Sequence, residues 1–349
     1  MQSRNACTGR RKVFFRTCCE PARPPFPAAG VTYQKKNSYL LQVKIPRPAT
    51  IVITRTLSAK YLLSTLSDYY ELTKPGITFT VLASMLVGFL MGAAGQVDYA
   101  VMAHAALGTW LIASGTAAHN MFMERGVDTL MRRTRKRPIP DNRISARSSS
   151  VFSISLILAG LVYLLAMVNL VAGTVALATT VIYLWAYTPL KRISALNVFV
   201  GAIPGALPVV GGWAAATGTV FEHGMWILFG IVFCWQIPHV MSIAWVCRKD
   251  YEHAGFQMLP KPDKKGRVTS AWILLPILAL FPTLYKLFIM DLAGMLYLSG
   301  SLAATLLFLY YGVRFAIHRT VDSAKPLMFA SFAYLPLIWI FIFIDWMIW

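Results

Sequence analysis

Apolar residues recur along this chain in runs long enough to cross a lipid bilayer. A membrane helix needs about 20 consecutive, mostly apolar residues, and nine such runs follow one another from residue 76 to the end. They cover about 76–95, 100–121, 151–169, 171–188, 197–217, 224–246, 270–289, 291–313 and 327–349. Because the segments between them are short, the pattern predicts an all-α membrane protein, with one bundle of about nine transmembrane helices.

The composition agrees with a membrane protein. Hydrophobic residues make up 57% of the chain and charged residues 13%, with a mean hydropathy of +0.57, which excludes an ordinary soluble domain. The net charge of +19 would suggest nucleic acid as the partner of a soluble protein. Here the positive charge lies in loops and in the N-terminal segment, so we predict a lipid bilayer and no nucleic acid as partner.

The charges are distributed unequally between the two ends of the predicted bundle. Counted from the first run, the even-numbered loops and the N-terminal segment hold 32 of the 33 Lys and Arg residues, and Lys286 is the exception. These loops are 122–150, 189–196, 247–269 and 314–326. Among Lys, Arg, Asp and Glu, the odd-numbered loops carry only acids, namely Asp98, Glu222 and Asp291. This asymmetry places the N-terminus and all even-numbered loops on the same, positive side of the membrane.

Residues 1–67 differ from the rest of the chain. They contain twelve Lys or Arg residues and a single acid, Glu20, with several Ser and Thr and no long apolar run. This composition is typical of a mitochondrial or plastid transit peptide and not of a secretory signal with an apolar centre. A disordered basic tail that binds anionic lipid is the alternative. We therefore expect two parts, a leader over 1–67 and a membrane domain over 68–349.

Three chelating side chains stand at helical spacing from the end of the second apolar run onward. Asn120, Glu124 and Asp128 are four residues apart, which places them in one stripe about 12 Å long on a helix. A run of cations follows at once: Arg132, Arg133, Arg135, Lys136 and Arg137. Carboxylates that hold Mg²⁺, beside guanidinium groups that hold phosphate, are what a diphosphate ester requires. A plain charged loop is the simpler alternative, but it requires neither the stripe nor the asparagine.

A second polar cluster closes the fourth run. Tyr187 and Lys191 are four residues apart, so a helical end would point both toward the same loop, and Pro189 is expected to break or kink that end. Lys191 is a candidate to bind a phosphate oxygen, and Tyr187 a candidate to donate a hydrogen bond to a leaving group. The alternative is an interfacial tyrosine beside cations that reach the membrane surface.

A third polar cluster closes the sixth run. Gln236 and His239 stand inside an apolar helix, where polar groups are expensive and usually face a cavity. A lone histidine in a membrane helix is as often only a hydrogen bond between helices. Asp250 and His253 follow in the next loop. All three clusters end even-numbered runs, so all three are expected to open on the same face of the membrane.

In these segments the chain resembles the UbiA-type membrane prenyltransferases, and within them the mitochondrial branch that prenylates haem. The family pattern Asn-x3-Asp-x3-Asp is matched by Asn120, Glu124 and Asp128. The haem branch is further matched by Met131, Arg133, Thr134, Arg137 and Pro138, by Tyr187 to Arg192, by 201–208, by Trp235 to His239, and by Asp250 to Pro260. The resemblance covers about residues 68–349. Cys247 departs from the second acidic motif of quinone-making relatives, so the resemblance does not imply a symmetric, two-motif metal site.

The resemblance implies a reaction. The farnesyl group of farnesyl diphosphate would be transferred to the vinyl group of protohaem IX (haem B) with addition of water, giving haem O and pyrophosphate for haem A and cytochrome c oxidase biogenesis. The cofactor would be Mg²⁺. The protein would be a multi-pass protein of the mitochondrial inner membrane, with active-site loops facing the matrix. A haem A synthase that receives haem O would be a further partner.

The resemblance also implies roles for single residues. Metal ligands would be Asn120, Glu124, Asp128 and Asp250. These four and Lys191 would be the catalytic residues. The diphosphate would be bound by Arg133, Arg137, Lys191, Arg192 and Tyr187. Haem would be bound by His239, Gln236 and His253.

Two other classes of protein share parts of this pattern. A quinone-pathway aromatic prenyltransferase would have the first motif, but such enzymes carry several aspartates in the second. A transporter or a non-enzymatic haem-binding subunit is the other alternative. A transporter often shows repeated halves, and a haem-carrying subunit usually places His pairs on facing helices. Neither feature is apparent in this sequence.

Overall fold

A computed structural model describes residues 62–261, 263 and 265–348, and within them every regular element is a helix. A helical segment that ends at residue 72 precedes the bundle. The elements after it are α2 (Pro75–Gly92), α3 (Tyr99–Asp128), α4 (Ala146–Met167), α5 (Leu170–Val181), the π-helix η1 (Ile182–Tyr187), α6 (Thr188–Leu190), α7 (Asn197–Thr217), α8 (His223–Val246), α9 (Arg248–His253), α10 (Arg267–Ile289), α11 (Met295–His318) and α12 (Val321–Ile348).

The predicted number of helical spans is confirmed for the described residues, which contain nine helical spans long and apolar enough to cross a bilayer. The predicted leader over 1–67 lies almost wholly outside the described residues, so the division of the chain at residue 67 stays a prediction. The helical bundle belongs to the compact unit Asp68–Trp349. One span, from Leu170 to Leu190, is continuous through α5, η1 and α6.

Several helices extend beyond the predicted apolar runs. α3 continues from residue 121 to Asp128, and α12 begins at Val321 instead of 327. The segment 314–326, predicted to be a loop, is therefore helical except for Arg319 and Thr320. Hydropathy detects only the part of a helix inside the hydrocarbon, whereas the backbone ladder continues where charged side chains reach water.

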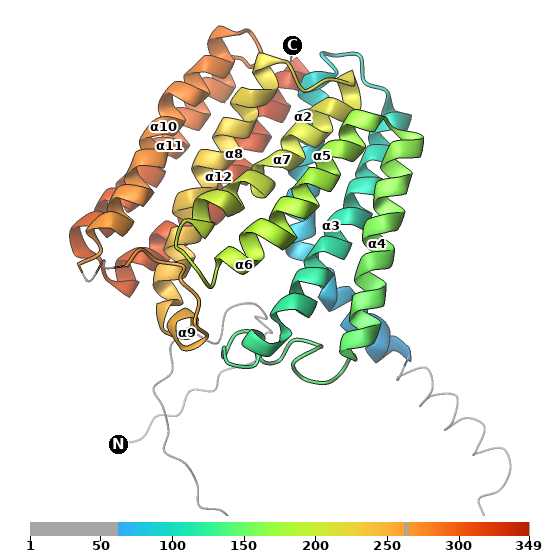
Figure 1. The fold of residues 1–349 in the computed structure, drawn as a ribbon. Helices are drawn as coiled ribbons and strands as arrows, with labels where there is room; N and C mark the ends of the chain where they lie inside the picture. Colours follow the sequence, from blue (N-terminus) through green and yellow to red (C-terminus); the bar gives the residue numbers. More distant parts are fainter. Residues whose placement is uncertain (1–61, 262, 264, 349) are drawn as a thin grey trace, which may run out of the picture. The chain divides into compact units, whose positions relative to one another are not determined.

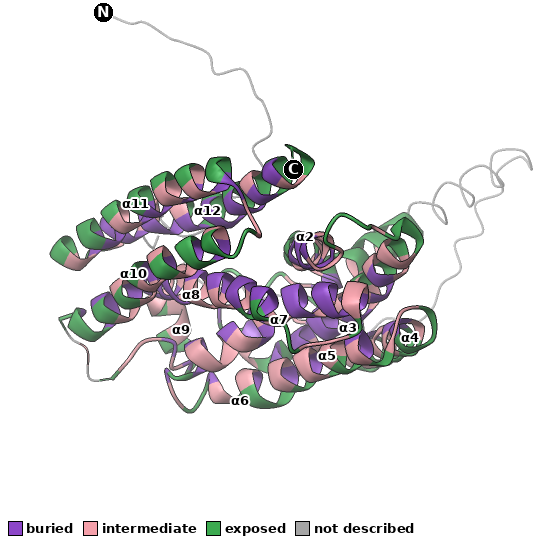
Figure 2. Ribbon diagram, turned by 90° about the horizontal axis from the view of Figure 1, so that it is seen from above, coloured by how far each residue is buried: buried purple, intermediate pink, exposed green. Residues whose placement is uncertain are grey.

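The spans lie side by side around α7 and α8. α3 packs along α4, α2 along α7 and α11 along α12, while α8 contacts α7, α10 and α12. α7 and α8 are the most buried spans, whereas the outward faces of α4, α10 and α11 are exposed (Figures 1 and 2). Large apolar side chains on those outward faces are suited to lipid, which replaces water as their solvent.

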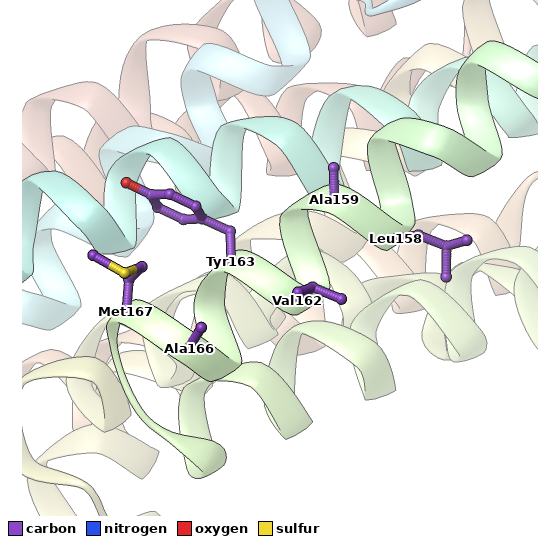
Figure 3. Close-up of a pocket in the computed structure, with 6 residues that line it drawn as sticks. All are labelled: Leu158, Ala159, Val162, Tyr163, Ala166 and Met167. Atoms are coloured by element: carbon purple, nitrogen blue, oxygen red, sulfur yellow. The ribbon is translucent and has the colours of Figure 1, made fainter.

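One open groove on α4 illustrates this outward apolar surface. Figure 3 shows its lining residues on α4, with the Tyr163 ring directed toward α3, where the hydroxyl lies 2.7 Å from His104 Nδ1. The groove is lined by Leu158, Ala159, Val162, Tyr163, Ala166 and Met167. These side chains offer almost no polar group for a charged substrate, so the groove is an outward apolar surface.

Two glycines bring the backbones of α2 and α7 into contact. A Cβ atom on Gly212 would lie 1.8 Å from the carbonyl oxygen of Met85, and a Cβ on Gly88 would lie 2.0 Å from that of Val209. Small residues at such crossings let membrane helices approach closely, and close packing is what holds them together in lipid. The contact is reciprocal, so neither helix can accept a side chain at its crossing point.

We expect Gly212→Ala to lower the stability of the bundle by about 1–3 kcal/mol, because the new methyl group must push a backbone carbonyl aside. Gly211→Ala is the matched control, since a Cβ atom at Gly211 would meet only Val175 Cγ1, at an ordinary 3.6 Å. Thermal unfolding of both variants in detergent measures the difference. Equal melting temperatures would show that the crossing tolerates a side chain.

Candidate active site

The predicted stripe of chelating groups forms the last turns of α3. Asn120, Glu124 and Asp128 are all buried, and the helix ends immediately after the third of them. Their shared face is thus helical, as the spacing predicted. Figure 1 shows that the end of α3, α6 and α9 lie at the same end of the bundle, which agrees with the prediction that the three polar clusters share one face.

The two acids of the stripe each form a buried ion pair with a predicted phosphate-binding cation. Lys191 Nζ donates to Glu124 Oε1 at 2.8 Å. Arg137 Nη1 donates to both carboxylate oxygens of Asp128, at 2.9 and 2.7 Å. Side-chain exposure is 10% for both members of the first pair, and 17% and 0% for Arg137 and Asp128. Such pairs need good geometry to offset the loss of water, and removing one partner is costly.

Asn120 completes the series with a cation that the sequence analysis had not singled out. Lys74, immediately before α2, donates from Nζ to Asn120 Oδ1 at 3.0 Å. The Asn120 amide nitrogen donates to Thr188 Oγ1 at 3.1 Å, and the Thr188 hydroxyl donates to the carbonyl of Tyr183. Because the hydroxyl hydrogen is used in that second bond, the amide orientation of Asn120 is determined and its oxygen faces Lys74.

Burial acts on the two lysines with opposite outcomes. Burial, together with the positive charge of Arg137, lowers the pKa of Lys74 to about 7. Burial also disfavours the charged form of Lys191, but the adjacent Glu124 carboxylate outweighs it and raises the pKa of Lys191. The Glu124 carboxylate thus keeps Lys191 in its charged form. The charged form of Lys74 would be stabilised most by a further anion nearby.

The π-helix η1 positions the second polar cluster. Pro189 has no backbone N–H and its ring would clash with the preceding turn of an α-helix, and the chain widens into η1 immediately before it. The predicted break is therefore a widened turn through which the helix continues to Leu190. Lys191 Nζ lies 4.4 Å from the centroid of the Tyr187 ring, so both side chains point the same way, as their spacing predicted.

Gly201 on α7 makes room for this arrangement. A Cβ atom there would lie 2.5 Å from the Tyr187 ring, so only glycine lets the ring lie against α7. The Tyr183 ring is 5.3 Å from that of Tyr187. The two rings form an aromatic wall beside the Lys191 ammonium group.

Arg143 holds the loop after α3 against the segment before α2. Its guanidinium group donates to Asp68, to Glu71 at 2.9 Å and to the carbonyl of Lys136 at 2.8 Å. One arginine therefore connects the neighbourhood of Lys74 with the loop that carries Arg137. This connection joins the two segments from which Lys74 and Arg137 reach the stripe.

The other predicted loop residues differ in their contacts and in their exposure. Arg133 donates to the Tyr251 hydroxyl of α9 at 3.4 Å. The side chains of Arg192 and His253 are exposed. Within the described ranges no group of three or more His, Cys, Asp or Glu side chains could hold a metal, so Asp250 is not assembled with Glu124 and Asp128 into such a cluster.

The two polar residues of α8 contact different neighbours. His239 Nδ1 lies 2.8 Å from Ser331 Oγ of α12. Gln236 lies against α7, where a Cβ atom on Gly205 would be 2.6 Å from Gln236 Oε1. His239 thus forms the hydrogen bond between helices that is the alternative role of a histidine in a membrane helix.

Lys74 and Thr188 were missed because their roles depend on residues far away in the sequence. Lys74 nevertheless left a signal, since no other Lys or Arg stands between Lys60 and Arg125. A single cation at the start of the first span, on the positive side, is a candidate for the same face as the stripe. Thr188 left no such signal, because a threonine near a helix end is common.

The donor set fits a hard divalent cation beside a diphosphate. Asn120, Glu124 and Asp128 present only oxygen ligands, which is the preference of Mg²⁺. The three cations opposite them are the groups that bind phosphate oxygens. A set of oxygen ligands alone does not suit a soft metal.

Comparison with known sequences identifies relatives over most of the chain. The profile of the UbiA prenyltransferase family matches residues 81–333. A protoheme IX farnesyltransferase of Solibacter usitatus is 42% identical over 287 residues, covering 80% of this chain and 98% of its own. Proteins of the same name from Opitutus terrae and Koribacter versatilis are 38% and 37% identical, covering 78% and 81% of this chain and 92% and 94% of theirs.

Solved structures share the fold at low sequence identity. A structure described as digeranylgeranylglyceryl phosphate synthase superposes with a TM-score of 0.69 and 17% identity, over 82% of this chain and all of its own. A UbiA homologue from Archaeoglobus fulgidus bound to GPP and Mg²⁺ superposes with a TM-score of 0.56 and 16% identity, over 79% of this chain and 99% of its own. At these identities the likeness concerns the arrangement of helices alone.

Proposed function

The chain belongs to the UbiA prenyltransferase family, and from that premise we propose that it transfers the farnesyl group of farnesyl diphosphate to the vinyl group of protohaem IX. The support is the name shared by relatives that are 37–42% identical and matched over nearly their whole length. Pyrophosphate leaves as the allylic C–O bond breaks, and addition of water to the cation formed by the transfer then gives haem O.

The observation that carries this proposal is the series of pairs along α3. Three oxygen donors of one helical stripe each face a cation, from the segment before α2, from the end of α6 and from the loop after α3. A diphosphate and its metal need these two kinds of group side by side. A haem-carrying or transport protein has no need of this combination.

The metal would be held by the stripe. Asn120, Glu124 and Asp128 would bind Mg²⁺ through oxygen, with Asp250 as a proposed further ligand or as the holder of a water molecule. When bound, Mg²⁺ would neutralise charge on the diphosphate and so make it a better leaving group.

The chain's own residues would then act on the diphosphate and on the farnesyl chain. Lys74, Lys191 and Arg137 would turn from their partners on α3 to phosphate oxygens and stabilise the charge that develops as the allylic C–O bond breaks. Tyr187, beside Lys191, would donate to the leaving group. Arg133 and Arg192, at the loop face, would attract the diphosphate as it approaches.

The apolar walls between the spans would keep water from the carbocation. The farnesyl carbon that loses the diphosphate is attacked by the vinyl π electrons, which forms the new C–C bond. Water then adds to the resulting cation next to the porphyrin ring and releases one proton. The Tyr183 and Tyr187 rings would form the wall nearest the reacting carbon.

A transfer assay tests the proposal directly. The purified chain in lipid nanodiscs would be given farnesyl diphosphate and Mg²⁺ with either haem B or an aromatic acid as acceptor. Formation of haem O, without prenylation of the acid, is the expected result. Prenylation of the aromatic acid would instead assign the chain to quinone synthesis. Haem binding detected by absorption spectroscopy, without any farnesyl transfer, would indicate that the chain is a haem carrier.

We further propose that the protein resides in the mitochondrial inner membrane and hands haem O to a haem A synthase. The basic composition of residues 1–67 supports import into mitochondria. The matrix would be the positive side of the bundle under the charge rule.

We expect the loops around Arg133, Lys191 and Asp250 to face the matrix together. Single cysteines placed in each loop, in a chain whose own cysteines are replaced, would be labelled in oriented mitoplasts with an impermeant maleimide. All three should react only after the inner membrane is opened. A cysteine at Glu222, in an odd-numbered loop, is the matched control and should react before opening. Reaction of two of the three loops from opposite sides would contradict this topology.

A further inference from the structure

Lys74 has a backbone conformation that residues with a side chain rarely adopt. Its φ and ψ angles are 48° and 61°, in the left-handed region, where residues other than glycine are uncommon. Such a conformation persists only where the surrounding structure enforces it. Here it makes the turn between the helical segment that ends at residue 72 and α2, which begins at Pro75. The direction of the Lys74 side chain toward Asn120 therefore depends on what holds this turn.

Hydrogen bonds hold the turn at Lys74 on both sides. The Lys74 N–H donates to the carbonyl of Glu71 at 3.2 Å, and the Lys74 carbonyl accepts from the N–H of Thr78 at 3.1 Å. The Thr78 hydroxyl donates to the carbonyl of Thr73 at 2.8 Å. The side toward α2 is thus fixed by α2 itself, whereas the other side depends on the position of Glu71.

Arg143 holds the side chain of Glu71 from the loop after α3. Arg143 Nη2 donates to Glu71 Oε2 at 2.9 Å and to the carbonyl of Lys136 at 2.8 Å, and Nη1 donates to Asp68. Glu71 therefore has two functions, because its carbonyl closes the Lys74 turn and its carboxylate binds Arg143. Removal of the guanidinium group would release this side of the turn without changing any residue that contacts the stripe.

Apolar contacts of the same segment would remain after the loss of Arg143. Leu72 is fully buried and packs in a cluster with residues of α3 and of the loop after it, namely Ala118, Met121, Ile139 and Ile144. The side chain of Arg143, by contrast, is 34% exposed. We therefore expect the segment before α2 to stay folded without Arg143, so that a loss of ligand affinity can be measured separately from unfolding.

We propose that Arg143 is a positioning residue of the diphosphate site, which keeps the ammonium group of Lys74 directed toward the stripe by holding the turn at Lys74. This inference rests on the proposed function, in which Lys74 binds a phosphate oxygen. Arginine suits this role, because its planar group carries five N–H donors and binds several acceptors at once. The acceptors here belong to two segments, which the guanidinium group joins.

Lys191 is held by a different set of contacts. Its carbonyl accepts from the N–H of Gln257 at 2.6 Å, and Asn197 Nδ2 donates to the carbonyl of Gln257 at 2.8 Å. These contacts come from α7 and from the segment after α9, and the partners described above for the Arg143 side chain take no part in them. Lys191 is therefore the matched control for Lys74, since both lysines face the stripe but Arg143 is connected with only one of their turns.

The test is a double-mutant cycle on diphosphate binding. Farnesyl thiodiphosphate, a non-reactive analogue, is titrated calorimetrically into the purified, full-length chain at a fixed Mg²⁺ concentration. Lys74→Met should weaken binding about 10–100-fold, as expected for a lost charge-assisted hydrogen bond. Arg143→Met should weaken it at least about threefold, within the range of coupling between residues of one hydrogen-bonded network. The double variant should bind no more weakly than Lys74→Met alone, because Arg143 acts through Lys74.

Two controls separate positioning of Lys74 from a merely structural role. In the same cycle with Lys191→Met in place of Lys74→Met, the two losses of affinity should multiply. Glu71→Ala removes the carboxylate that joins the segments and should weaken binding, whereas Asp141→Ala removes a partner of Arg143 within its own loop and should not. The side chains of Glu71 and Asp141 are similarly exposed, at 45% and 52%. Thermal unfolding shows whether each variant is folded.

The outcomes also separate this inference from the function on which it rests. If the wild type binds no farnesyl thiodiphosphate, the proposed function fails. If the wild type binds it and both Arg143→Met and Glu71→Ala keep the wild-type affinity, the positioning role alone fails. Losses that multiply in the cycle with Lys74 would overturn the proposal as well. Losses that fail to multiply in both cycles would also overturn it, because Arg143 would then support the whole site instead of Lys74.

Discussion

Asp128→Asn is expected to lower the rate of farnesyl transfer by at least about 100-fold, the scale seen when one group that stabilises a developing charge is removed. The substitution preserves the volume of a side chain that is fully buried. It removes the negative charge that holds Arg137 and that would hold the metal. Saturating Mg²⁺ should not restore the rate, because the missing ligand belongs to the protein.

Asp141→Asn is the matched control for this variant. Asp141 lies in the same loop, and its side chain is 52% exposed and pairs with Arg143 at 3.3 Å. The rate at saturating Mg²⁺ and farnesyl diphosphate is the measurement. Glu124→Gln, a second buried member of the stripe, should lose activity in the same way. Retained activity in both Asp128→Asn and Glu124→Gln would remove the stripe from the mechanism.

Lys191→Met should affect both ligand binding and stability. A lost charge-assisted hydrogen bond to phosphate is worth about 1.5–3 kcal/mol, so we expect farnesyl thiodiphosphate to bind about 10–100-fold more weakly. The variant also leaves Glu124 buried without its cation, and breaking a buried pair costs about 3–5 kcal/mol of stability.

The double variant Lys191→Met with Glu124→Gln separates these two effects. Without the unpaired charge, most of the stability should return, while diphosphate binding stays weak. Calorimetric titration and thermal unfolding in detergent measure the two quantities. Lys249→Met, an exposed lysine of α9, is the control and should change neither. Recovery of full diphosphate affinity in the double variant would show that Lys191 serves only to neutralise Glu124.

The spans and the stripe were predictable because they depend on local periodicity. Nine apolar runs give nine helices whatever their partners, and side chains four residues apart share a helix face wherever the helix packs. Asn120, Glu124 and Asp128 could therefore be placed together before any contact was known. Tyr187 and Lys191 follow the same rule, because the widened turn of η1 ends before it separates them.

The partners of the stripe could not be predicted in this way. Lys74 reaches Asn120 across 46 residues and Lys191 reaches Glu124 across 67, and periodicity carries no information about such pairs. The distribution of charged residues indicates on which side of the membrane a loop lies, but not which residues it contacts. For Asp250 the sequence indicates only the side of the membrane and the motif to which the residue belongs. The structure shows it outside any cluster of metal-ligating side chains in the described chain, so its role stays a prediction.

The glycine crossing between α2 and α7 has a bearing on how the protein is made. Membrane helices first insert and then associate, and α3, α4 and the span Leu170–Leu190 enter the bilayer between these two partners. The neighbouring pair α2 and α3 can meet early, and with it Lys74 and Asn120. The surface of α2 around Gly88 stays without its packing partner until α7 has been synthesised. During that interval it is open to lipid or to a chaperone, so assembly of the candidate active site is completed late in biogenesis.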